Sequence, residues 1–126
     1  MQHEYGIFGG IEGENILSFI ETYNKTLIVT LHTVIPNPSV KMKAVTETII
    51  ARANEIVVLT QASKKTIEEI YPLAIGKVNV IPHGIHDTPF STTTRPKRKL
   101  KLENKNVLST FGLLSRGKGI EYVIAA

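Results

Sequence analysis

The chain contains no cysteine. Without thiols it can form neither a disulfide framework nor a thiolate metal site, and this absence fits a reducing compartment. It also lacks an apolar run near the ~20 residues that a bilayer-spanning helix needs. The first residues do not have the basic and then apolar pattern of a secretory signal peptide. We therefore predict a cytoplasmic protein.

Aromatic residues are scarce around the most basic part of the sequence. Residues 95–101 hold five lysines and arginines, and Phe90 is the one aromatic nearby. Bases bound in single strands usually stack on aromatic rings, so we expect no nucleic-acid partner. The run favours a solvated linker that its own charges keep extended. Two alternatives for this basic run are binding to nucleic acid and peripheral contact with an anionic membrane surface.

The composition is that of a globular protein, with 42% hydrophobic and 21% charged residues in a total of 126. Apolar segments rich in β-branched residues cover 26–31, 55–60 and 78–81. Amphipathic segments at 12–23, 40–53 and 64–71 alternate with them, the last capped by Ser63 or already begun at Gln61. Strands of this kind, alternating with helices, predict an α/β fold with a Rossmann-like parallel sheet covered on both faces.

The two ends of the chain predict an incomplete protein. Residues 1–10 have the composition of a loop, and we expect a strand to precede them. Residues 88–104 have no apolar period, which predicts a linker. A new strand is expected at 107–111 and a helix from Ile120 onward. One strand and part of a helix cannot form a domain, so we expect this chain to be a fragment with two incomplete domains, 1–87 and 105–126.

Polar residues follow each predicted strand of the first domain. They are His32 and Thr33, Thr60 and Gln61, and His83 and Gly84. In open parallel sheets, ligands bind beyond the carboxyl ends of the strands, so a site is expected here. His32 is a candidate general base because histidine exchanges protons near neutral pH, although it could simply bond a neighbouring loop. Pro82 and Gly84 predict that the strand runs into a turn, because Pro82 cannot donate to a sheet and Gly84 allows a positive φ.

The histidines do not predict a metal site. Glu4, His32, His83 and His86 carry suitable ligand atoms, but His83 and His86 lie outside a predicted helix and lack a carboxylate at a recognised spacing. We therefore expect no bound metal.

A glycine-rich loop, Phe-Gly-Leu-Leu-Ser-Arg-Gly-Lys-Gly at 111–119, joins the last predicted strand and helix. Gly112, Arg116 and Lys118 suit a phosphate or diphosphate, because glycines allow close backbone approach and the cations neutralise charge. The pattern also matches most of a P-loop, with Gly119 in place of the hydroxyl residue that would hold Mg²⁺. A P-loop nucleotide-binding domain and a plain glycine-rich turn with surface cations remain alternatives.

Four phrases in order extend through most of the chain: Thr-Leu-His-Thr at 30–33, Ile-Val-Val-Leu-Thr at 56–60, Val-Ile-Pro-His-Gly-Ile at 80–85, and the loop at 111–119. Together they resemble the retaining glycosyltransferases of the GT-B fold in the large group-1 family. Residues 3–10 resemble a cleft-facing loop of a bacterial branch of it. The resemblance implies that residues 1–87 are the later part of an N-terminal, acceptor-side domain. Residues 105–126 would then begin the C-terminal, donor-binding domain.

The resemblance implies transfer of a sugar from a nucleotide-diphosphate donor to a glycan, lipid or small-molecule acceptor, with retention and without a cofactor. It assigns the donor diphosphate to Gly112, Arg116 and Lys118, and it places His32 at the transferred sugar as the catalytic candidate. The acceptor side of the cleft would be lined by Glu4, Gly9, Gly10, His83 and Gly84.

The sequence departs from the family in two respects. Leu113 stands where the family often has an arginine that clamps the diphosphate. The family's C-terminal glutamate motif and its N-terminal glycine-rich loop are absent, so we do not expect this chain to be catalytically active by itself. A non-catalytic basic α/β binding module is the remaining alternative.

Overall fold

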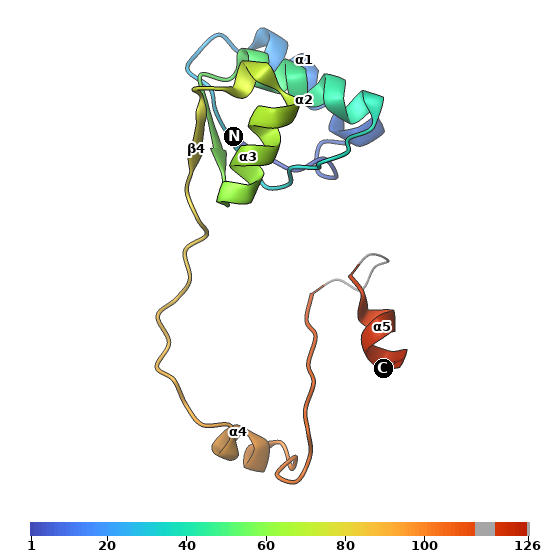
Figure 1. Ribbon diagram of the computed structural model, residues 1–126, viewed down its shortest axis with the longest axis vertical. Helices are drawn as coiled ribbons and strands as arrows, with labels where there is room; N and C mark the ends of the chain where they lie inside the picture. Colours follow the sequence, from blue (N-terminus) through green and yellow to red (C-terminus); the bar gives the residue numbers. More distant parts are fainter. Residues whose placement is uncertain (113–117, 126) are drawn as a thin grey trace. The chain divides into compact units, whose positions relative to one another are not determined.

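The computed structural model describes residues 1–112 and 118–125. The chain divides into two compact units, Met1–Ile85 and His86–Ala126, which are drawn in blue to yellow and in yellow to red in Figure 1. In the described residues, no helix combines the length and the hydropathy needed to cross a membrane.

The first unit is built on a four-stranded sheet in the order β1-β2-β3-β4. The strands are β1 (Gln2–His3), β2 (Ile28–Leu31), β3 (Glu55–Val58) and β4 (Val78–Val80). Every neighbouring pair is parallel, with His3 opposite Leu31 and Leu31 opposite Val58. The predicted α/β class and parallel sheet are therefore confirmed.

Three α-helices connect these strands: α1 (Ile16–Thr22), α2 (Val40–Arg52) and α3 (Gln61–Ile70). Short 3-10 turns, η1 (Ile11–Gly13) and η2 (Pro72–Ala74), precede α1 and follow α3. The helix predicted over 12–23 starts later, because Glu12 has a left-handed φ of 57°. Thr60 caps α3 by accepting a bond from the Ser63 amide at 3.0 Å, so the helix begins at Gln61 and Ser63 is not its cap.

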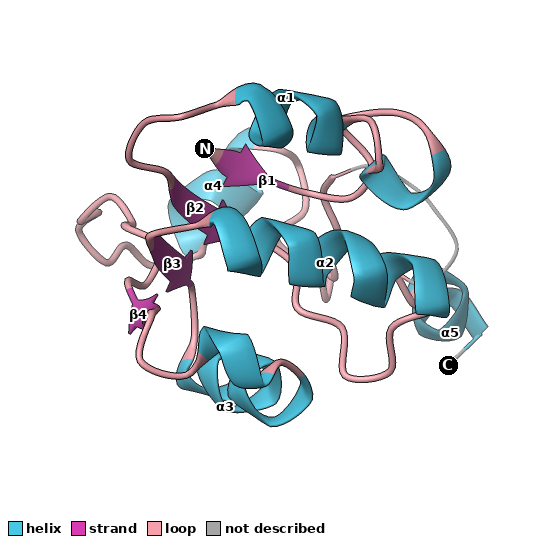
Figure 2. Cartoon of the chain, turned by 90° about the horizontal axis from the view of Figure 1, so that it is seen from above, coloured by secondary structure: helices cyan, strands magenta, loops and turns pink. Residues whose placement is uncertain are grey.

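The helices of the first unit cover one face of its sheet. A sheet built from consecutive strands with crossovers of one hand has all its helices on the same side, and Figure 2 shows α1, α2 and α3 together there. Facing them, a core forms around fully buried side chains (Ile20, Val29, Ile49, Ile56, Val58). The opposite face carries partly or fully exposed side chains (Gln2, Ile28, Thr30, Glu55, Val57, Asn79). The prediction that both faces are covered is wrong within residues 1–85.

Three further predictions need correction. Residues 2–3 were expected to belong to a loop, but they form β1, because the backbone of β2 is there to pair with them. Residues 94–99 of the expected linker form a short helix, α4 (Thr94–Lys99). Residues 107–111 do not form a strand, because no other described segment pairs with them and their exposed backbone can bond to water instead. The predicted last helix is present as α5 (Ile120–Ala125).

Candidate functional site at the carboxyl ends of the strands

The carboxyl ends of the four strands share one edge of the sheet because all four run in the same direction. Glu4 follows β1, His32 and Thr33 follow β2, and Thr60 comes shortly after β3. His83 follows β4 after a short extended segment. The sequence predicted that the residues after β2, β3 and β4 would meet at one edge, and the parallel sheet brings them there. The position of Glu4 after a strand was not predicted, because residues 1–10 were expected to form a loop.

His32 and His83 come together at this edge. Their ring centroids are 5.8 Å apart and their ring planes are inclined by 41°. Both side chains are exposed, so a ligand could reach either ring. His32 Nε2 also lies 2.6 Å from Gln2 Oε1, which fixes the orientation of its ring from the neighbouring strand.

Glu4 ties the end of β1 to the end of β2. Its Oε2 accepts a hydrogen bond from the Thr33 hydroxyl at 2.6 Å, and its Oε1 accepts one from the Tyr5 amide at 3.2 Å. Because both carboxylate oxygens are engaged in local bonds, Glu4 braces the strand-end loops in this structure.

The loop after β1 that contains Gly9 and Gly10 needs these glycines because of its backbone conformation. Gly9 and Gly10 both have a φ of 71°. A Cβ on Gly10 would lie 2.6 Å from Asn15 Oδ1 and 2.8 Å from Glu14 Cγ, so no other residue fits there without rearrangement. The turn predicted at Gly84 is absent: Gly84 does not have a positive φ, and a Cβ there would meet nothing within 4 Å.

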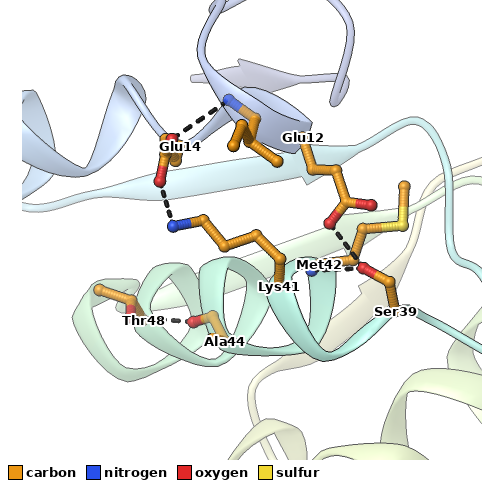
Figure 3. Close-up of polar contacts among 8 residues, drawn as sticks. Glu12, Glu14, Ser39, Lys41, Met42, Ala44 and Thr48 are labelled. Atoms are coloured by element: carbon orange, nitrogen blue, oxygen red, sulfur yellow. Dashed lines mark hydrogen bonds and ion pairs between the residues drawn. The ribbon is translucent and has the colours of Figure 1, made fainter.

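Helix α2 holds the far end of this loop, as Figure 3 shows. The Ser39 hydroxyl donates to Glu12 Oε2 at 2.6 Å and accepts from the Met42 amide at 3.1 Å, so the cap of α2 is also an anchor for η1. Lys41 forms an ion pair with Glu14, whose other oxygen accepts a bond from the Ile11 amide. These contacts lower the pKa of the Glu14 carboxyl, the hydrogen bond from Lys41 being the main cause.

Sequence reasoning did not single out His3, which is fully buried. Its ring stacks on Phe8 with centroids 5.6 Å apart and meets the edge of Tyr5 at 5.1 Å. Neither ring nitrogen has a hydrogen-bond partner among the described residues. Burial lowers the pKa of His3, and the nearby Glu4 carboxylate opposes that shift. The signal in the sequence was a histidine followed closely by two aromatic residues, at a chain end where such side chains are uncommon.

Tyr5 completes this buried cluster. Its hydroxyl lies 2.7 Å from the Thr46 hydroxyl on α2, which in turn donates to the Met42 carbonyl. Burial raises the pKa of Tyr5. The segment that follows β1 is therefore joined to α2 through the Tyr5 side chain.

The residues expected to hold the donor belong to the second unit. Gly112 has a φ of 113°, and Lys118 is exposed just before α5. Arg116 lies outside the described residues. Within the described part of the chain, no three histidine, aspartate or glutamate side chains group as metal ligands would.

A comparison with known protein families, with characterised proteins and with solved structures finds no significant match to this chain.

Proposed function

We propose that the chain is part of a glycosyltransferase of the GT-B type, which transfers a sugar from a nucleotide-diphosphate donor to an acceptor with retention. One observation carries the proposal. Two of the four resembling phrases, at 30–33 and 80–85, supply His32 and His83, whose rings lie 5.8 Å apart at the carboxyl edge of a parallel sheet. Ligands of open α/β sheets bind at that edge.

His32 is the residue that we assign to the transferred sugar. When Gln2 Oε1 accepts the hydrogen bond at 2.6 Å, the proton of the neutral ring is on Nε2. Nδ1 then remains an acceptor for a sugar or acceptor hydroxyl. A histidine whose proton position is set by a neighbour is suited to orient a hydroxyl or to take up its proton.

Lys118, Gly112 and Arg116 are the residues that we assign to the donor diphosphate. Negative charge grows on the departing nucleoside diphosphate in this reaction, and a fixed cation stabilises that charge in the transition state. Lys118 is exposed and Gly112 has the backbone freedom of a glycine with positive φ. Glu4, Gly9, Gly10, His83 and Gly84 would line the acceptor side.

The test uses the full-length protein with a panel of nucleotide sugars and with glycan, lipid and small-molecule acceptors. Transfer should be detected, and Lys118→Ala should lower turnover by at least ~10²-fold, the scale for one preorganised charge partner. Lys25→Ala, which removes an exposed lysine from the loop before β2, is the matched control and should leave turnover unchanged.

Two results would argue against the proposal. Full turnover by the Lys118→Ala variant would remove Lys118 from the donor site. ATP or GTP hydrolysis that depends on Lys118, in a protein that transfers no sugar, would favour the P-loop alternative instead.

A further inference from the structure

The second unit carries a basic surface around α4. Arg95, Lys97, Arg98 and Lys99 lie on this helix and Lys101 follows it. The four ion pairs found among the described residues all lie in the first unit, so carboxylates do not neutralise these cations there. Arg95 and Lys99 are four residues apart and therefore share one side of the helix, where like charges repel. An anion bound between them would relieve this repulsion.

Two adjoining hollows flank the helix. The first is lined by Ser91, Thr92, Arg95, Pro96 and Lys99 and has a volume of about 520 Å³. Two cations and two hydroxyls are the donors that a phosphate group takes up with its oxygens. This hollow therefore has the chemistry of a phosphate site.

The second hollow is mainly apolar. Its volume is about 370 Å³, and it shares Ser91, Thr92 and Pro96 with the first. Leu100, Leu102 and Val107 supply its apolar walls. Lys97 Nζ bonds to the Lys105 carbonyl at 2.8 Å, which folds the segment after α4 back toward the helix. A phosphate site thus lies beside an apolar one.

Exposed apolar side chains accompany the cations. Phe90 is 96% exposed and Leu100 is 66% exposed. Cations beside exposed apolar groups are typical of segments that lie in the interface of an anionic membrane, where the charges meet headgroups and the apolar groups enter the acyl boundary. A nucleic acid would instead gain from several stacking rings, and Phe90 is the one aromatic near this surface.

We propose that residues 90–107 bind an anionic phospholipid at a membrane surface. Arg95, Lys99, Ser91 and Thr92 hold the phosphate of the headgroup, while Phe90 and Leu100 enter the apolar layer. The observations that carry this proposal lie entirely in the second unit and do not depend on the proposed transferase activity.

The experiment measures co-sedimentation of the full chain with vesicles of phosphatidylcholine alone and of phosphatidylcholine mixed with phosphatidylglycerol. Binding should require phosphatidylglycerol and weaken as salt is added. The double variant Arg95→Ala with Lys99→Ala should bind about 30-fold more weakly, because each basic residue near an anionic surface contributes about 1 kcal/mol. Lys25→Ala with Lys65→Ala removes the same charge from the first unit and should change binding little.

Three further measurements test which compound supplies the bound phosphate group. Phe90→Ser with Leu100→Ser keeps every charge and should still weaken vesicle binding, because apolar insertion is lost. Saturable binding of inorganic phosphate without vesicle binding would contradict the proposal of a lipid ligand and favour a soluble phosphate compound. Salt-dependent binding of duplex DNA without vesicle binding would overturn it in favour of nucleic acid. If Arg95→Ala with Lys99→Ala loses no more vesicle binding than Lys25→Ala with Lys65→Ala, the proposed site itself is overturned.

Discussion

The rings of His32 and His83 lie 5.8 Å apart although their strands are not neighbours. His32 follows β2 and His83 follows β4, and β3 lies between these strands in the sheet. The two side chains therefore approach each other across the carboxyl end of β3. This closeness brings together two segments that are far apart in the sequence, and it defines the centre of the candidate site.

The first prediction concerns His32 and Gln2. If the protein has the proposed transferase activity, His32→Ala should lower kcat by ~10²-fold or more, the scale for a residue that handles a proton. Gln2→Ala should have a smaller effect and should alter the pH profile of kcat, because it removes the contact that sets the proton position on the ring. An unchanged kcat and profile in both variants would show that the pair is structural.

The second prediction concerns the buried ring of His3. Its pKa is lowered from the ordinary value of 6.5 because burial disfavours the charged form, with Glu4 opposing. Below pH 6.5 the unfolded chain takes up a proton that the folded chain does not, so the free energy of unfolding falls as the pH falls. Above pH 6.5, His3 is neutral in both the folded and the unfolded chain, so it no longer makes the free energy of unfolding depend on pH. Urea unfolding from pH 7.5 to pH 5 measures this slope.

His3→Phe should flatten that slope, because it keeps a ring against Phe8 and removes the titrating group. His86→Ala removes an exposed histidine of the second unit and should leave the slope as it is in the parent. If His3→Phe unfolds with the same pH dependence as the parent, then another group causes it.

The third prediction concerns Gly13. Its φ is 82°, and a Cβ there would lie 2.7 Å from the Tyr5 carbonyl oxygen, which belongs to the backbone and cannot swing away. Gly13→Ala should lower the free energy of unfolding by roughly 2 kcal/mol or more, since the left-handed conformation alone costs about 1–2 kcal/mol. Gly6→Ala is the matched control, because that position has open space and no positive φ. Equal unfolding midpoints in urea for the two variants would contradict the prediction.

The fourth prediction concerns the start of α3. Thr60→Ala should cost about 1 kcal/mol of stability, the usual loss for an N-cap hydroxyl, because the Ser63 amide loses its acceptor at 3.0 Å. Ser63→Ala leaves that bond in place and removes only the contact between the two hydroxyls, so its cost should be smaller. A larger loss in Ser63→Ala would mean that Ser63 is the cap after all.

The candidate site was predictable where it depends on strand direction and was not where it depends on local backbone geometry. Runs such as 26–31 and 55–60 predict parallel strands, and parallel strands place His32 and His83 at the same edge. The conformation of Gly84 was predicted wrongly, because a proline followed by a glycine is compatible with several turns and only the surrounding structure selects one. Thr60 and Ser63 are both good caps by residue type, and the point at which β3 ends decides between them.

The sequence by itself determined the alternation of strands and helices in residues 26–81. Local apolar periodicity encodes each of these elements, and they appear with small differences at their ends. The tertiary structure alone decided that Gln2 and His3 form a strand, because two residues have no period and become a strand only when β2 offers them a partner. It also decided that His3 is buried beneath Phe8 and Tyr5, and that the helices of the first unit share one face. These features arise from contacts between residues distant in the sequence, which no local pattern specifies.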